Sequence, residues 1–163
     1  MARPVKEAKR KDVHERALGL LAVRARSRRE LERRLLQAGF QTDEVETELA
    51  RLERVGLIDD AAFARQLAQH AFGSGAKGRR AVASALFAKG VDPEVAASTL
   101  EELGGDEDQR ALDLASSRAP RLTGIDPQKA FQRLSGLLMR RGYAPEVARS
   151  AARRALARDP VGD

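Results

Sequence analysis

Hydrophobic positions along the chain repeat one pattern three times, and each copy ends in Gly followed by another apolar residue. Each copy has two apolar residues four positions apart, a third beside the second, and the Gly three positions later. The copies are Leu31, Leu35, Leu36, Gly39 and Phe40; Val82, Leu86, Phe87, Gly90 and Val91; and Leu134, Leu138, Met139, Gly142 and Tyr143. The glycines lie 51 and 52 residues apart. This periodicity predicts three similar units instead of one irregular core.

Apolar residues at helical spacing lead up to each of these glycines, so each Gly is predicted to end a helix in the left-handed conformation. In the first unit, Ser27 and Glu30 form a capping-box pattern, which predicts a middle helix from about Arg28 to Ala38. The third helices are predicted to begin at Thr42 or Asp43, at Asp92 before Pro93, and at Ala144 before Pro145. Apolar residues at helical spacing in 13–21, 63–71 and 111–115 predict a leading helix in each unit.

These elements predict an all-α fold with nine helices in three tandem, helix-turn-helix-like units. The units are expected to form an elongated array, curved or straight, over residues 12–56, 57–104 and 105–158. Gly and Asp mark both boundaries between units, where Gly ends one helix and Asp caps the next. Residues 1–11, which are basic, and residues 159–163 are expected to be a flexible arm and tail.

Composition excludes several classes of protein. Aromatic residues make up 4% of the chain, so the cores must be small, and the absence of Cys excludes disulfides and thiolate metal sites. No apolar stretch approaches the ~20 residues that span a bilayer, and the basic N-terminus lacks the apolar middle of a secretory signal. We therefore expect a cytoplasmic monomer with no membrane contact.

Enzyme chemistry has little support in the sequence. The only histidines are His14 and His70, and the carboxylates are expected on exposed helix faces among basic neighbours. The segment 73–78 resembles a phosphate-binding loop, but Gly78 is followed by Arg79 where a Walker loop requires Lys-Ser or Lys-Thr. We expect no catalytic residue, no metal site and no cofactor.

The net charge of +6 is distributed unevenly. Residues 1–34 hold 12 basic and 5 acidic side chains, and residues 129–158 hold 8 basic and 1 acidic. In contrast, residues 41–60 hold 7 acidic and 2 basic side chains, and residues 92–113 hold 8 acidic and 1 basic. Alternation of this kind can simply keep helices soluble, but here it follows the repeat.

Two pairs of arginines occupy the same places in the first two units. Arg28-Arg29 and Arg79-Arg80 lie 11 and 10 residues before the Gly that ends the middle helix. Positive charge at a helix start opposes the helix dipole, so helix stability does not explain it, whereas an acidic partner does. Alternatively, the stems cover apolar surface and the charged heads lie in water. In the third unit the charge moves to Arg140, Arg141, Arg149, Arg153 and Arg154.

The outline of a helix-turn-helix also suggests DNA binding. However, the helix that would enter the major groove is acidic in the first two units, with Asp43, Glu44 and Glu46 in the first. Acidic side chains repel phosphates, and aromatic platforms for single strands are scarce. DNA contact through phosphates stays open as an alternative function.

The chain resembles the RecX family of bacterial regulators of the RecA recombinase. The resemblance extends from about Val13 to Leu156 and depends on short segments in a fixed order. They are Arg26-Ser27-Arg28-Arg29-Glu30-Leu31, Gly39-Phe40, Gly56-Leu57-Ile58-Asp59-Asp60, Phe63-Ala64, Lys89-Gly90-Val91 and Arg140-Arg141-Gly142-Tyr143.

The resemblance implies a non-catalytic protein that binds the groove of the RecA–DNA filament. It implies inhibition of ATP hydrolysis, strand exchange and co-protease action, and so a role in recombinational repair and the SOS response. The residues expected to contact the filament or its DNA are Arg28, Arg29, Arg33, Lys77, Arg79, Arg80, Lys89, Arg140, Arg141, Arg149 and Arg153. Two alternatives remain: binding single- or double-stranded DNA without RecA, and a helical adaptor for an unrelated partner.

Overall fold

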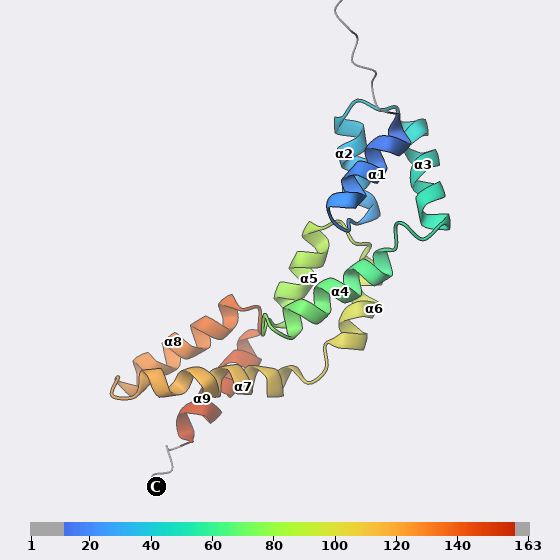
Figure 1. Ribbon diagram of the computed structural model, residues 1–163. Helices are drawn as coiled ribbons and strands as arrows, with labels where there is room; N and C mark the ends of the chain where they lie inside the picture. Colours follow the sequence, from blue (N-terminus) through green and yellow to red (C-terminus); the bar gives the residue numbers. More distant parts are fainter. Residues whose placement is uncertain (1–11, 159–163) are drawn as a thin grey trace, which may run out of the picture. The chain divides into compact units, whose positions relative to one another are not determined.

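A computed structural model describes residues 12–158 and is all-helical in this part of the chain. The helices are α1 (Val13–Val23), α2 (Arg28–Gln37), α3 (Thr42–Arg54), α4 (Asp60–Phe72), α5 (Arg79–Ala88), α6 (Pro93–Leu103), α7 (Glu107–Arg118), α8 (Pro127–Arg140) and α9 (Pro145–Ala157), with the short 3-10 helix η1 (Ala119–Leu122) after α7 (Figure 1). The predicted all-α fold is confirmed. The arm and tail predicted at 1–11 and 159–163 lie outside the described residues.

The predicted helix ends agree with the backbone conformation. Gly39, Gly90 and Gly142 have φ angles of 90°, 74° and 95°, which is the left-handed region that ends a helix at low cost for Gly. Ser27 caps α2 by accepting from the Glu30 N–H at 3.2 Å. α3 begins at Thr42, as predicted, but the residue that caps it is Gln41, whose N–H donates to the Glu44 carboxylate at 3.0 Å.

The chain divides into two compact units, the first of which runs to Phe63 and includes Lys89–Val91. In this unit α1, α2 and α3 surround a single apolar core. Its buried members are Ala17, Leu31, Leu35, Val45, Leu49, Leu52 and Ile58. Each helix contributes residues spaced three or four apart, which is why one face of each is apolar.

Two buried carboxylates stabilise the first unit, contrary to the prediction that carboxylates lie on exposed faces. Glu30 accepts from Arg24 Nη2 at 2.5 Å and from Arg26 Nη1 at 2.6 Å. Burial acts to raise the pKa of Glu30, but the hydrogen bonds and charges of these arginines outweigh it and the pKa is lowered. Glu48 is buried against His14 Nδ1. Sequence patterns do not reveal such pairs because the partners come from different turns or helices.

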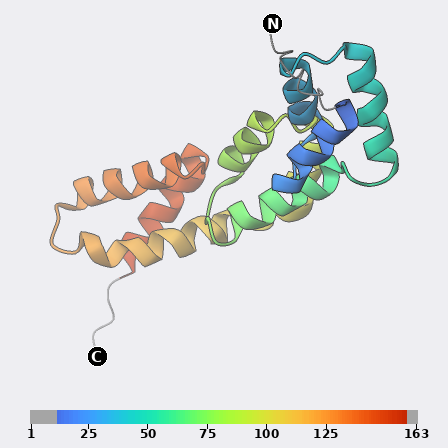
Figure 2. The ribbon, with the colours of Figure 1, turned by 45° about the horizontal axis from the view of Figure 1, so that its top comes forward.

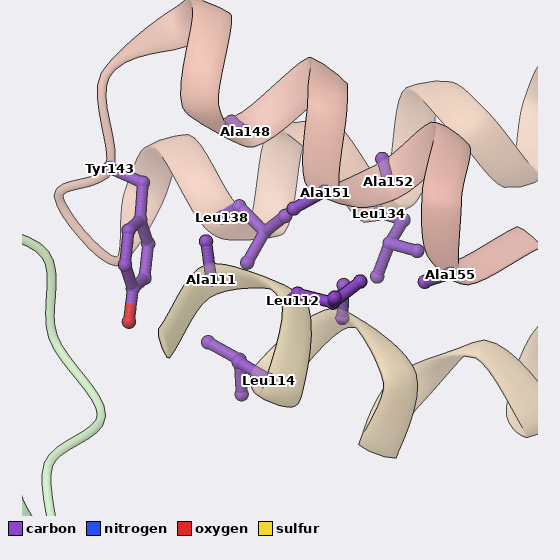
Figure 3. Packing of buried hydrophobic residues seen from close by; sticks show 11 residues of the cluster. Ala111, Leu112, Leu114, Leu134, Leu138, Tyr143, Ala148, Ala151, Ala152 and Ala155 are labelled. Atoms are coloured by element: carbon purple, nitrogen blue, oxygen red, sulfur yellow. The ribbon is translucent and has the colours of Figure 1, made fainter. Parts of the chain in front are cut away.

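The second compact unit contains Ala64–Ala88 and the chain from Asp92 onward. Within it α7, α8 and α9 lie side by side in both ribbon views (Figures 1 and 2), and α7 and α8 both pack against α9. Their core is rich in Ala and has Tyr143 at one end (Figure 3). Small side chains allow the three helices to approach closely.

The glycine-rich segment between α4 and α5 packs against the loop before α9. Gly78 N–H donates to the Arg141 carbonyl at 2.9 Å, and the Tyr143 hydroxyl donates to the Ala76 carbonyl at 2.8 Å. A Cβ at Gly78 would lie 2.4 Å from the Gly142 carbonyl oxygen, so only Gly permits this approach. Burial is the main reason that the pKa of Tyr143 is raised. The segment that superficially resembles a phosphate-binding loop is thus a packing element.

Candidate partner-binding surface

The first arginine of each predicted pair begins a middle helix. Arg28 is the first residue of α2, and its N–H donates to Asp60 Oδ1 at 2.9 Å. Arg79 is the first residue of α5, and its N–H donates to Glu107 Oε1 at 2.7 Å. These acidic residues are themselves the first residues of α4 and α7. Each leading helix therefore caps the preceding middle helix with a carboxylate, which the free N–H groups at a helix start favour.

The side chain of Arg28 is also bound within its own unit. Its Nη2 lies 3.1 Å from Glu46 Oε2 and its Nε lies 2.7 Å from Glu53 Oε1, both on α3. Partial burial acts to lower the pKa of Arg28, but the hydrogen bond to Glu46 and the negative charges of Glu53 and Glu46 raise it overall. The acidic partner that the sequence predicted for this arginine includes α3 of the same chain.

Arg79 is held by the loop before α7. Its Nη2 donates to the Gly105 carbonyl at 3.1 Å, whereas its buried Nε has no hydrogen-bond partner. A Cβ at Gly104 would lie 2.7 Å from this Nε, so the guanidinium lies directly over a residue that has no side chain. Arg79 is half-buried, and these partners lie in the same compact unit as Arg79.

The second arginine of each pair is different, because Arg29 and Arg80 are exposed. Neither guanidinium forms an ion pair or a hydrogen bond within residues 12–158. The stem of Arg29 lies over Gly90, where a Cβ would be 3.0 Å from Arg29 Cβ. Each predicted pair thus consists of one arginine bound within the chain and one whose charge faces solvent.

The remaining predicted contact residues divide in the same way. Arg141 is half-buried, and its Nη1 donates to the Gly75 carbonyl at 3.0 Å. Arg153 is exposed and lies over the Phe131 ring, 5.5 Å from its centroid. The other exposed basic side chains of the set are Arg33, Lys77, Lys89, Arg140 and Arg149. Arg28, Arg79 and Arg141 therefore bind other residues of the chain, and the other eight face solvent.

A mainly apolar pocket lies in the third unit. It has a volume of about 420 Å³ between η1, the start of α8 and the end of α9, and its lining includes Leu122, Ile125 and Leu156. Ser116 Oγ beside it is buried without a hydrogen-bond partner. In residues 12–158 no group of three or more His, Cys, Asp or Glu could hold a metal ion, and no helix could cross a membrane.

Family models match the chain at three places. The descriptions are "RecX, first three-helix domain" at residues 14–52, "RecX, second three-helix domain" at 59–100 and "RecX, third three-helix domain" at 106–152. The chain belongs to the RecX family. The three matches correspond to α1–α3, α4–α6 and α7–α9, and they confirm that the units are arranged in tandem.

Relatives named "Regulatory protein RecX" cover most of the chain. The protein of Amycolatopsis mediterranei is 38% identical over 143 residues, which are 87% of this chain and 82% of that protein. The protein of Mycolicibacterium smegmatis is 44% identical over 136 residues, which are 80% of this chain and 72% of that protein.

Two solved structures share the fold. RecX from Lactobacillus salivarius has a TM-score of 0.76 at 20% identity over 88% of this chain and 94% of that chain. A second structure, of "regulatory protein RecX", has a TM-score of 0.68 at 22% identity over 83% and 67%.

Three apolar residues of this RecX-family chain were not predicted as surface residues. Leu36, Phe87 and Met139 lie three positions before the helix-ending glycines, and the sequence grouped them with the apolar stripe. Their exposed fractions are 39%, 77% and 37%. The signal was present in their spacing, because each directly follows a fully buried residue and so lies about 100° away around the helix.

Proposed function

We propose that this chain binds RecA filaments on DNA, spanning their groove, and inhibits ATP hydrolysis, strand exchange and co-protease activity. Through these activities it would modulate recombinational repair and the SOS response. The observation that carries the proposal is the recurrence of exposed basic side chains without ion-pair partners in all three units of a RecX-family chain. We assign the contact to Arg29, Arg33, Lys77, Arg80, Lys89, Arg140, Arg149 and Arg153, with Arg28, Arg79 and Arg141 as supporting residues.

Inhibition of this kind requires no active site. A ligand that binds one state of the filament more tightly than another shifts the population toward that state. A chain of three similar units can contact several recombinase subunits, and complementary charge sets the register of the contact and increases the rate of encounter. The proposal is supported by the difference between the two arginines of each pair. One is bound within the chain, and the other leaves an unpaired charge at the same position of two successive units.

The proposal is tested by titrating the protein into ATP hydrolysis by the cognate RecA on single-stranded DNA. We expect inhibition at well below one molecule per RecA subunit, without matching affinity for bare DNA in the same buffer. Full hydrolysis at equimolar protein would contradict the proposal.

A charge-matched pair of variants tests the surface itself. Replacing Arg29, Arg33 and Arg80 by Ala should weaken filament binding at least several-fold. The control replaces Arg16, Arg54 and Arg121, which are also exposed arginines but lie outside the assigned surface. Both variants lose three positive charges, so equal loss of binding in the two would show that only net charge matters and would overturn the assignment.

A second candidate function, DNA binding through phosphates, is favoured by α9 alone. This helix exposes Arg149, Arg153 and Arg154 and has one acidic residue, Glu146. Binding of this kind would make log affinity for bare DNA fall linearly and steeply as log salt concentration rises. Tight, salt-sensitive binding to bare DNA without inhibition of RecA would favour this function over the first.

We further propose that the protein acts as a cytoplasmic monomer without cofactor. The family assigns a regulatory role, and the exposed side chains favour a binding surface over a reaction centre. Light scattering after size exclusion tests the oligomeric state: a mass close to 17.8 kDa would agree with the proposal.

A further inference from the structure

The outward face of α2 combines charge with an exposed apolar residue. Arg29, Arg33 and Leu36 follow one another at spacings of four and three, so they share one helix face. Arg29 and Arg33 are exposed and form no ion pair with another described residue. Leu31 and Leu35, which are fully buried, lie on the opposite face. This face of α2 is thus directed to solvent, with two free guanidinium groups beside a 39% exposed Leu.

The equivalent face of α5 has the same character. Arg80, Ser84 and Phe87 occupy the corresponding three positions and are all exposed, whereas Val82 and Leu86 are fully buried on the other side. Phe87 is 77% exposed, the largest value among the large apolar residues described. An aromatic ring in water at this exposure contributes nothing to the core of its own unit.

The third unit reaches the same arrangement by a different route. Met139 occupies the apolar position and is 37% exposed, but Gly136 stands where α2 has Arg33. The guanidinium of Arg140 fills this place, because a Cβ at Gly136 would lie 3.2 Å from Arg140 Nη1. A guanidinium on the same helix face as an exposed apolar residue is therefore present on α2, α5 and α8, although the residues that supply the charge differ.

We propose that these faces are docking stripes for the protein part of the filament and not for its DNA. The outer stripes are defined as Arg29, Arg33 and Leu36 on α2; Arg80, Ser84 and Phe87 on α5; and Met139 with Arg140 on α8. Each fits an apolar pocket flanked by carboxylates on the surface of the recombinase. This inference rests on the proposed function and adds to it which component of the filament is recognised.

The chemistry of the apolar position distinguishes protein from nucleic acid. Stacking on bases requires a flat π surface, which Phe87 has but Leu36 and Met139 lack. What the three positions share is apolar character, and the complement of an apolar side chain is a pocket in a protein. The unpaired guanidinium groups beside them require an acidic partner, and an arginine with an aromatic residue is the composition of interface centres.

The test compares Phe87→Ala, Phe87→Leu and the control Val23→Ala, in the full chain. Val23 is 76% exposed and lies at the end of α1, outside the stripes, so the control truncates an apolar side chain of nearly the same exposed fraction elsewhere. Each variant is measured for affinity to the cognate RecA filament on a single-stranded oligonucleotide and to the same oligonucleotide alone. Circular dichroism establishes that all three are folded, as the exposure of both side chains leads us to expect.

We expect Phe87→Ala to weaken filament binding about 10-fold or more, which is the effect of a central interface residue. Phe87→Leu should stay within about 3-fold of the wild type because it keeps an apolar side chain, and Val23→Ala should match the wild type. Affinity for the bare oligonucleotide should be the same for all four proteins.

Two results would overturn the inference while leaving the proposed function intact. One is filament binding by Phe87→Ala equal to that of the wild type. The other is equal loss in Phe87→Ala and Phe87→Leu together with weaker binding to the bare oligonucleotide, which would assign the ring to base stacking. A wild-type protein that fails to bind the filament at all would instead refute the proposed function, and the inference with it.

Discussion

Arg28 and Arg29 are adjacent in α2, but their side chains perform different tasks. Arg28 pairs with Glu46 and Glu53, whereas Arg29 is exposed and has no ion-pair partner among the described residues. We predict that Arg28→Ala lowers the free energy of unfolding by about 1 kcal/mol, since two partly exposed ion pairs are lost. Arg29→Ala should change it by less than about 0.5 kcal/mol. Urea unfolding followed by circular dichroism measures both.

The same two variants should have the opposite order in filament binding. Arg29→Ala removes a charge that faces solvent, so it should weaken the complex more than Arg28→Ala does. Testing Arg28 and Arg29 one at a time is more informative than replacing Arg28, Arg29, Arg79 and Arg80 together. The combined variant would lose stability and contact with the filament at once, so the two effects could not be told apart. Equal effects of Arg28→Ala and Arg29→Ala on stability would show that the α3 ion pairs contribute nothing measurable.

The ionised carboxylate of Glu30 should make part of the free energy of unfolding depend on pH. Its pKa is lowered in the folded chain by Arg24 and Arg26, so the stabilisation is present above the unfolded pKa of about 4.3 and is lost as pH falls through the folded pKa. At pH 7, Glu30→Gln should be less stable than the wild type by about 1–3 kcal/mol. The difference should shrink as pH falls below about 4.3, where Glu30 of the unfolded chain takes up a proton first and Glu30 of the folded chain follows at lower pH. Thermal unfolding of both proteins between pH 3 and 7 tests this, and a difference that is independent of pH would contradict it.

At the scale of elements, Gly142, which follows α8, packs closely against the start of α5. It has a φ of 95°, and a Cβ there would lie 2.3 Å from Ala81 Cβ and 2.5 Å from Ala81 N. Gly124 has a φ of 83° but no atom within 4 Å of its ideal Cβ. We predict that Gly124→Ala costs about 1–2 kcal/mol for the left-handed backbone alone. Gly142→Ala should cost more, by at least about 1 kcal/mol, because the backbone must also move. Thermal melts of the two variants measure the difference, and equal melting temperatures would contradict it.

The sequence predicted the elements well where one residue type determines the local structure. Glycines in the left-handed region, Ser27, Asp92 and the prolines that begin α6 and α9 all act through their nearest neighbours, so their helix ends were found. Gln41 was missed because Gln is an unusual cap, and it is the carboxylate of Glu44 that satisfies its N–H. The sequence pattern also missed the first turn of α8. This helix begins 15 residues before Gly142, whereas α2 and α5 begin 11 residues before their glycines.

Across the described chain, the alternation of charge is partly satisfied internally. The acidic segment 41–60 supplies Glu46 and Glu53 to Arg28, and the segment 92–113 supplies Glu107 to the N–H of Arg79 and Glu102 to Arg65 at 3.8 Å. The sequence therefore identified a set of basic residues but not which of them are free. That distinction depends on contacts between residues 18 to 37 positions apart, and a periodic pattern contains no information about such pairs.

The free basic side chains lead to a prediction for the whole molecule. If filament binding uses the eight exposed basic residues, electrostatic steering should make the association rate fall several-fold between 50 and 200 mM salt. The dissociation rate should change less, because the apolar residues of the outer stripes are insensitive to salt at these concentrations. Interferometry on immobilised RecA filaments measures both rates. The Arg29, Arg33 and Arg80 triple variant should associate more slowly at 50 mM salt and depend less on salt. An association rate that is equal at both salt concentrations would show that these charges do not direct the encounter, and the assigned surface would then have to be abandoned.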